Sequence, residues 1–169
     1  MLRPDVHYFP NSDDPAIAPF ALAFIRMMFA HAELEARIRD LQNVLKDDPT
    51  FGEKIHPWTA QKRPKLMKDF IVEQCGSIPE ADQIEDCLKG AIPLCDVRNH
   101  LAHGQWWAFD PNAGTITVRR GRIFEDEEEQ HKKFSAADIE HVAAALRDTE
   151  AKLYKLEAVI KAQLKRDWY

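Results

Sequence analysis

The sequence predicts a mostly α-helical bundle that carries one β-hairpin within a single domain spanning residues 1–169. Two long stretches place apolar residues at alternating spacings of three and four, which is typical of helices that pack along one face. Between them, aromatic and β-branched residues flank a Pro-Asn-Ala-Gly turn, which is typical of a hairpin. A chain of 169 residues can bury one sizeable core, so no domain boundary is expected.

The first long helix is predicted over about residues 15–45, after an extended N-terminal arm at 1–14. Pro15 suits the first helical position, and the preceding aspartates can cap it. His31 falls on the apolar seam, where we interpret it as a core histidine bonded to a neighbour. A loop is expected over 47–57. The seam residues are Ile17, Phe20, Phe24, Met27, Leu34, Ile38, Leu41 and Leu45.

Two further helices are predicted before the hairpin, over 64–75 and from residue 79 onward. Gly76 is expected to end the first of them. In the second, Pro93 cannot donate to the carbonyl of Lys89, which predicts a kink or a break. The stretch after Pro93 is expected to be helical up to His103, with Gly104 following the helix end.

The hairpin is predicted over 105–120, and the acidic run 125–129 is expected to be a solvated loop. Ser135 and Asp138 form a capping-box-like start for a last helix that reaches about residue 165. We expect this helix and the first one to form a central antiparallel pair. Its seam residues are Ile139, Val142, Leu146, Thr149, Leu153, Leu156 and Ile160.

The net charge of −5 and the pI of about 5.8 exclude nucleic-acid binding driven by overall charge. Any RNA contact must therefore come from a local basic patch. The candidates are Arg119, Arg120 and Arg122 just after the hairpin, or Lys62, Arg63 and Lys65 before the second helix.

The three cysteines include no C-x-x-C pair, so we expect no disulfide framework and a cytoplasmic, reducing location. The N-terminal residues lack the apolar core of a signal peptide. The most apolar stretch, 16–32, contains Arg26 and His31, which favours a core helix over a membrane span. No membrane association is expected.

The stretch from Asp96 to Gly104 holds the densest group of side chains that could do chemistry at neutral pH. On a helix, Asp96, Asn99 and His103 share one face, whereas Arg98 lies about 140° round from His103. This split favours a site shared by two subunits over a self-contained one. The alternative is an ordinary helix end, with His103 on the last carbonyl groups and Arg98 in an ion pair.

The pattern Arg98-Asn99-x-x-x-His103 within a helical chain resembles the HEPN superfamily (higher eukaryotes and prokaryotes nucleotide-binding domain). The signature of that superfamily is an arginine, commonly a polar residue after it, and a histidine after four to six intervening residues. The resemblance implies a HEPN-like bundle with the hairpin 105–120 as an insertion. It also implies a homodimeric, metal-independent endoribonuclease that needs no cofactor and whose two motifs face one cleft.

In that resemblance, His103 assists proton transfer while the RNA 2′-hydroxyl attacks the adjacent phosphate. Arg98 binds the phosphate, and Asn99 positions His103 or the phosphate. Helix geometry adds Asp96 as an orienter of His103. One of the adjacent Trp106 and Trp107 should point outward, and an outward-facing Trp107 can stack on a base. The alternative, which we favour, is that these rings pack the hairpin on the bundle. The products would be a 2′,3′-cyclic phosphate and a 5′-hydroxyl. Many such proteins belong to toxin–antitoxin or phage-defence systems, which implies RNA and an antitoxin or another protein as partners.

Three alternatives stay open. The chain can be an inactive HEPN-like module that dimerises and binds a nucleotide, RNA or a protein. It can also be a helical scaffold outside any such family. Metal binding is the third, because Cys95, His100 and His103 read C-x4-H-x2-H, but no second ligand pair stands at zinc-site spacing, so no metal is expected.

Overall fold

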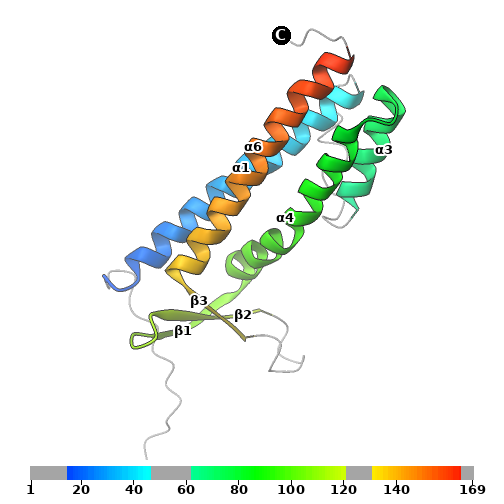
Figure 1. Cartoon of the computed structure of the whole chain (residues 1–169). Coiled ribbons are helices and arrows are strands. Elements are labelled where there is room, and N and C mark those ends of the chain that lie inside the picture. The colour runs from blue at the N-terminus through cyan, green and yellow to red at the C-terminus, as the bar shows by residue number, and fades with distance from the viewer. Residues whose placement is uncertain (1–14, 47–61, 121–130, 165–169) are drawn as a thin grey trace, which may run out of the picture. The chain divides into compact units, whose positions relative to one another are not determined.

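The structure, a computed structural model, describes residues 15–46, 62–120 and 131–164. The predicted N-terminal arm 1–14, the loop 47–57, Arg122 and the acidic run 125–129 lie outside these residues. The fold is mostly α-helical, as predicted, with a small antiparallel sheet (Figure 1). Its elements are α1 (Ala18–Lys46), α3 (Arg63–Cys75), α4 (Pro79–His103), β1 (Gln105–Asp110), β2 (Thr115–Arg119), β3 (His131–Ser135) and α6 (Ala136–Leu164).

The chain divides into two compact units. The first unit takes Met1–Phe29 and Asp96–Ala144, and the second takes Ala30–Cys95 and Ala145–Tyr169. The helices α1, α4 and α6 each contribute residues to both units. The sheet and the last two turns of α4 belong to the first unit, which therefore holds the whole predicted site.

In the first unit, the predicted hairpin is present as β1 and β2, and β3 adds a third strand that the sequence did not predict. Asp110 closes the turn, since its Oδ1 accepts hydrogen bonds from the main-chain N–H groups of Asn112 and Ala113. Only Phe134 in β3 has a large apolar side chain. The rest of β3 is polar because it forms a sheet edge, where exposed lysines oppose pairing with other chains.

The inner face of the sheet packs against helices of the same unit. The ring of Phe109 meets Phe20 of α1 edge-on at 5.8 Å, and the ring of Trp106 meets Phe24 at 5.6 Å. Trp106 also donates a hydrogen bond from Nε1 to the carbonyl of Leu101 in α4, at 3.1 Å. These contacts supply the helical support that an isolated hairpin lacks.

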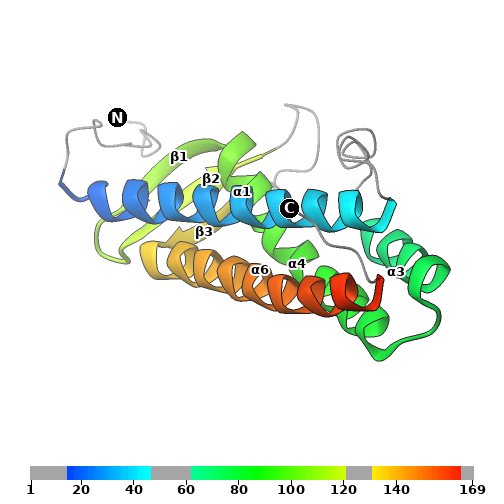
Figure 2. The ribbon, with the colours of Figure 1, turned by 90° about the horizontal axis from the view of Figure 1, so that it is seen from above.

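The second unit contains the C-terminal part of α1, α3, most of α4 and the long C-terminal part of α6. Most seam positions predicted for α1 and α6 are buried, and Thr149 is 8% exposed. Within each unit, however, the α1 and α6 segments run in the same direction (Figures 1 and 2). The prediction of two long antiparallel helices is therefore wrong. The segment between α1 and α6 contains one long return helix, α4, so both helices point the same way.

Two predicted helix ends are confirmed, but the prediction that the first helix begins at Pro15 is wrong, because residues 15–17 form a turn and α1 begins at Ala18. Gly76 ends α3 with a φ of 77°, which an L-residue seldom adopts. At the start of α6, Asp138 accepts hydrogen bonds from the main chain and hydroxyl of Ser135, and Ser135 Oγ accepts one from the Asp138 N–H. This is the reciprocal capping box that the sequence indicates.

The helix α4 continues through Pro93, so the predicted break is absent. Proline removes one helical hydrogen bond, to the carbonyl of Lys89. Lys89 and Pro93 are both exposed. Water can therefore hydrate the Lys89 carbonyl, and the helix persists.

None of the helices within the described ranges combines the length and the apolar character that a bilayer span requires.

Candidate functional site

The candidate site lies on the last two turns of α4, from Asp96 to His103, where the helix meets the sheet. The Gly104 N–H donates to the carbonyl of His100 at 2.9 Å and closes the helix, as predicted. A Cβ atom on Gly104 would overlap the His100 carbonyl and the Val118 side chain and would lie 3.0 Å from the Arg119 carbonyl. The end of α4 is thus pressed onto the end of β2, with no space for a side chain between them.

The two histidines of the motif have opposite environments. His100 is 5% exposed, contacts the ring of Phe134, and its Nε2 lies 3.0 Å from the Val118 carbonyl oxygen. Burial lowers the pKa of His100, and although the bond to Val118 opposes this, nearby Lys132 and Arg120 lower it further. His103 is exposed. The structure therefore assigns His100 to packing and leaves His103 available for chemistry.

Arg98 is half-buried and is held by the residue that follows it. Its Nη1 donates a hydrogen bond to Asn99 Oδ1 at 2.8 Å. Its Nε is buried and has no hydrogen-bond partner among the described residues. Asn99 thus positions the guanidinium directly, and no hydrogen bond joins Asn99 to His103 in the described part of the chain.

The structure does not bring every predicted site residue together. Asp96 is exposed, and no hydrogen bond links it to His103 among the described residues. The ordinary helix-end alternative also lacks its contacts: within those residues, Arg98 forms no ion pair and His103 binds no terminal carbonyl. Arg98 and His103 are five residues apart, so their side chains leave the helix about 140° from each other.

A basic cluster surrounds the end of the sheet nearest to this site. Arg119 pairs in register with Gln105, which lies two residues after the end of α4. The guanidinium of Arg119 lies 5.5 Å from the centre of the Trp107 ring. The sequence predicted Arg119, Arg120 and Trp107 here but missed the contribution of β3. The additional residues are His131, Lys132 and Lys133, which pair with the end of β2. A signal was present, since His131, Lys132 and Lys133 stand just before Phe134 and the capping box.

The other predicted basic patch is largely neutralised by carboxylates of the second unit. Arg63 lies 2.6 Å from Glu35, and Lys65 lies 2.7 Å from Asp69. His31, predicted to be a core histidine, has a side chain that is 13% exposed and lies 3.8 Å from the same Glu35.

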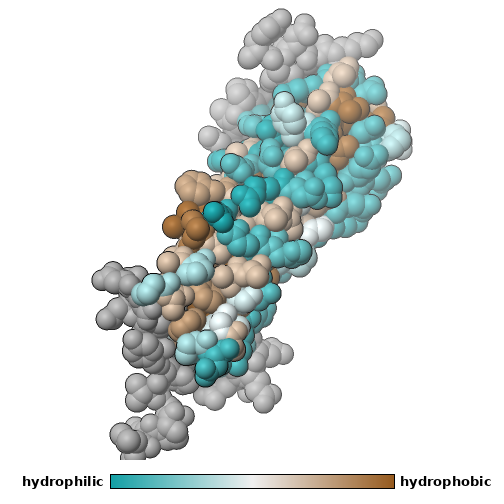
Figure 3. Space-filling model, turned by 60° about the vertical axis from the view of Figure 1, so that its left-hand side comes forward, coloured by the Kyte–Doolittle hydropathy of each residue, from teal (hydrophilic) through white to brown (hydrophobic). Residues whose placement is uncertain are grey.

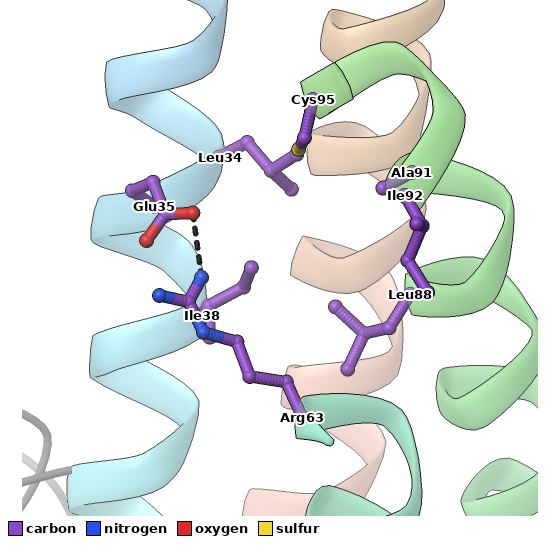
Figure 4. A pocket seen from close by; sticks show the side chains of 8 residues that line it. All are labelled: Leu34, Glu35, Ile38, Arg63, Leu88, Ala91, Ile92 and Cys95. Carbon is purple, nitrogen blue, oxygen red and sulfur yellow. Dashed lines mark hydrogen bonds and ion pairs between the residues drawn. The ribbon is translucent and has the colours of Figure 1, made fainter. Parts of the chain in front are cut away.

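A small cavity and an open groove in the second unit are poor candidates for a catalytic site. The cavity beside the Arg63–Glu35 pair has a volume of about 20 Å³, enough for one water molecule (Figure 4). It is otherwise lined by apolar groups and Cys95. An open groove between α4 and α6 contains Cys87, but burial raises the pKa of that thiol, which opposes formation of a nucleophilic thiolate.

Within residues 15–46, 62–120 and 131–164, no group of three or more His, Cys, Asp or Glu side chains is placed to hold a metal ion. His100 of the C-x4-H-x2-H pattern is turned to Val118 instead. Comparison of the chain with protein-family models, with curated proteins and with solved structures finds no match.

Proposed function

We propose that the chain is a metal-independent endoribonuclease that acts as a homodimer and cleaves RNA with Arg98, Asn99 and His103. One observation carries the proposal: an exposed imidazole, His103, follows by five residues an arginine that a neighbouring amide holds in place. The resemblance of this pattern to HEPN ribonucleases supports the same function.

In the proposed reaction, the RNA 2′-hydroxyl attacks the adjacent phosphorus and the bond to the 5′ oxygen breaks. His103 accepts the proton of the 2′-hydroxyl and donates a proton to the departing 5′ oxygen. Arg98 stabilises the negative charge that develops on the phosphate. The products are a 2′,3′-cyclic phosphate and a 5′-hydroxyl end, and no metal ion takes part.

The dimer is proposed because one helix cannot easily direct Arg98 and His103 at the same phosphate. An apolar stripe on α1 of the same unit supports it, since Leu22, Ile25 and Phe29 are 49%, 49% and 67% exposed. Their spacing of three and four places them on one helix face. On the side that Figure 3 presents, hydrophobic side chains form small patches within a mostly hydrophilic surface. A second copy of the chain would cover such a stripe.

The test is cleavage of a mixed single-stranded RNA pool in the presence of EDTA, followed on a denaturing gel. We expect cleavage by the wild type and a loss of about 10²–10⁴-fold in His103→Ala, since the variant lacks its acid–base group. His141→Ala, which removes an exposed histidine of α6, is the matched control and should retain full activity. The fragments should carry 3′ ends that resist alkaline phosphatase until the cyclic phosphate is opened.

Absence of cleavage by the wild type would overturn the enzyme proposal, as would equal cleavage by the wild type and His103→Ala. Dimerisation without cleavage would favour the inactive HEPN-like binding module. A toxin role predicts that expression of the wild type, and not of His103→Ala, arrests growth of the host cell.

A further inference from the structure

The outer face of the sheet differs from the inner face in chemistry. Residues paired directly across antiparallel strands lie on one face, so the apolar row Phe109–Ile116–Phe134 marks the inner side. The outer side therefore carries the rows Gln105–Arg119–His131, Ala108–Thr117–Lys133 and Asp110–Thr115–Ser135. Two of its cross-strand rows thus contain a basic side chain of β3.

A bulge adds an aromatic ring to this outer face. The register shifts between Trp106 and Ala108, so Trp107 has no residue opposite it on β2. The guanidinium of Arg119 lies 5.5 Å from the centre of the Trp107 ring. A ring that contacts an outer-face arginine lies on the outer face itself, whereas the neighbouring Trp106 faces α1.

Among the described residues, no carboxylate forms an ion pair with the cations at this end of the sheet. Within the described part of the chain, no ion pair involves Arg119 or Lys133 of the outer face. The same holds for Arg120 and Lys132, which act on buried His100. Most other described lysines and arginines do form ion pairs. These are Arg26, Arg37, Lys46, Arg63, Lys65, Lys68, Lys89, Lys152 and Lys161. Within residues 15–46, 62–120 and 131–164, the basic side chains at this end of the sheet thus have no carboxylate partner, although the protein has a net charge of −5.

We infer that this outer face binds single-stranded RNA, with a base stacked on Trp107 and the phosphates along the basic residues of β2 and β3. Stacking platforms beside cationic tracks are the general means of holding single strands, whose bases expose their π faces. Duplex RNA hides those faces and is recognised by shape and backbone. The inference rests on the proposed function, because the basic end of the sheet adjoins the end of α4 and would lead a bound strand to His103.

The test is binding of a short fluorescein-labelled single-stranded RNA, followed by anisotropy. The protein is the full chain with His103→Ala, so that the RNA stays intact. In this background, we expect Trp107→Ala to raise Kd by about 5–150-fold, the range for loss of one stacked base. Trp107→Phe should restore most of the affinity. Tyr154→Ala removes an exposed aromatic ring of the second unit and should leave Kd unchanged.

The basic track has its own readout. Lys133→Ala should weaken binding and reduce the slope of log Kd against log salt by about 0.7, the value for one contact to a single-stranded phosphate. Lys155→Ala, an exposed lysine of α6 without an ion pair among the described residues, should change neither quantity. Circular dichroism of each variant must match that of the parent, and Trp107→Phe serves as the folded comparison.

The outcomes separate this inference from the proposed function. RNA cleavage by the wild type that Trp107→Ala and Lys133→Ala leave unchanged, together with unchanged binding, would overturn the inference alone. Binding that depends on Trp107 without any cleavage by the wild type would overturn the ribonuclease alone. Equal or tighter binding of the duplex form, or equal competition by polyglutamate, would show another kind of ligand and contradict the inference.

Discussion

His100 Nε2 lies 3.0 Å from the main-chain oxygen of Val118, so a buried imidazole joins the last turn of α4 to the central strand of the sheet. The carbonyl can only accept, so Nε2 carries the proton and the ring is bonded in its neutral form. Protonation of this ring would place a charge in an apolar setting that also faces Lys132 and Arg120.

The stability of the chain should therefore depend on pH through His100. Its pKa lies below the ordinary value of 6.5 in the folded state, so the unfolded chain binds the proton more readily. The contribution is fully present above pH 6.5 and is lost as the pH falls through the folded pKa. Urea unfolding at a series of pH values checks this. His100→Gln does not titrate, so its free energy of unfolding should fall less than that of the wild type on acidification.

Gly104→Ala should destabilise the protein by about 1–3 kcal/mol, because the added methyl group overlaps His100 and Val118. Gly90→Ala is the matched control within α4, since its Cβ meets open space. That variant should gain about 0.5–1 kcal/mol from better helix propensity. Thermal unfolding by circular dichroism measures both. A Gly104→Ala protein as stable as the wild type would contradict the close approach of α4 to β2.

Arg37→Ala should cost about 2–4 kcal/mol, because it leaves the Glu157 carboxylate, 4% exposed, without its arginine. Lys161 remains 2.7 Å from Glu157 and keeps the loss from being larger. Arg26→Ala removes an exposed pair with Glu140 and should cost less than about 1 kcal/mol. Denaturant titration compares the two variants, and equal losses would contradict the special role of the buried carboxylate.

Phe29→Glu should dissociate the proposed dimer, because it places a charge in the exposed apolar stripe of α1. Light scattering at tens of micromolar should change from the mass of two chains to that of one. Val72→Glu alters an exposed apolar residue of α3 and should leave the mass unchanged. A wild type that is already monomeric at this concentration would contradict the dimer.

Mixing two inactive variants tests whether the site is shared. If Arg98 of one subunit acts with His103 of the other, a dimer of Arg98→Ala with His103→Ala retains one intact site. An equimolar mixture should then recover about a quarter of the wild-type activity, since half of the dimers are mixed and each has one of two sites. A self-contained site predicts no recovery at all, although each variant alone gives the same low activity in both cases.

Local signals in the sequence predicted much of this fold. Gly76, Gly104 and the Ser135–Asp138 box mark element ends through interactions within a few residues, and the structure confirms them. Most residues of the predicted apolar seams are buried, because burial follows helical periodicity. These features depend on nearest neighbours along the chain, which a single sequence records directly.

Features set by tertiary contacts were not predictable. Residues of β3 form a strand because they pair with β2. The polar residues of β3 do not show the alternating apolar pattern that would predict a strand. The parallel course of α1 and α6 depends on how the intervening helices return. His100 is buried and His103 is exposed because His100 is the one whose imidazole reaches the Val118 carbonyl. Helix spacing alone does not reveal which of the two histidines makes this contact.

The bulge at Trp107 makes β1 tolerant of one particular in-frame deletion. Trp106 and Ala108 oppose consecutive residues of β2, Val118 and Thr117, so removal of the codon for Trp107 would leave a regular ladder. Loss of Phe109 would instead shift the turn and reverse the facing of the residues beside it. A single in-frame deletion could therefore remove the Trp107 ring during evolution and leave the sheet intact.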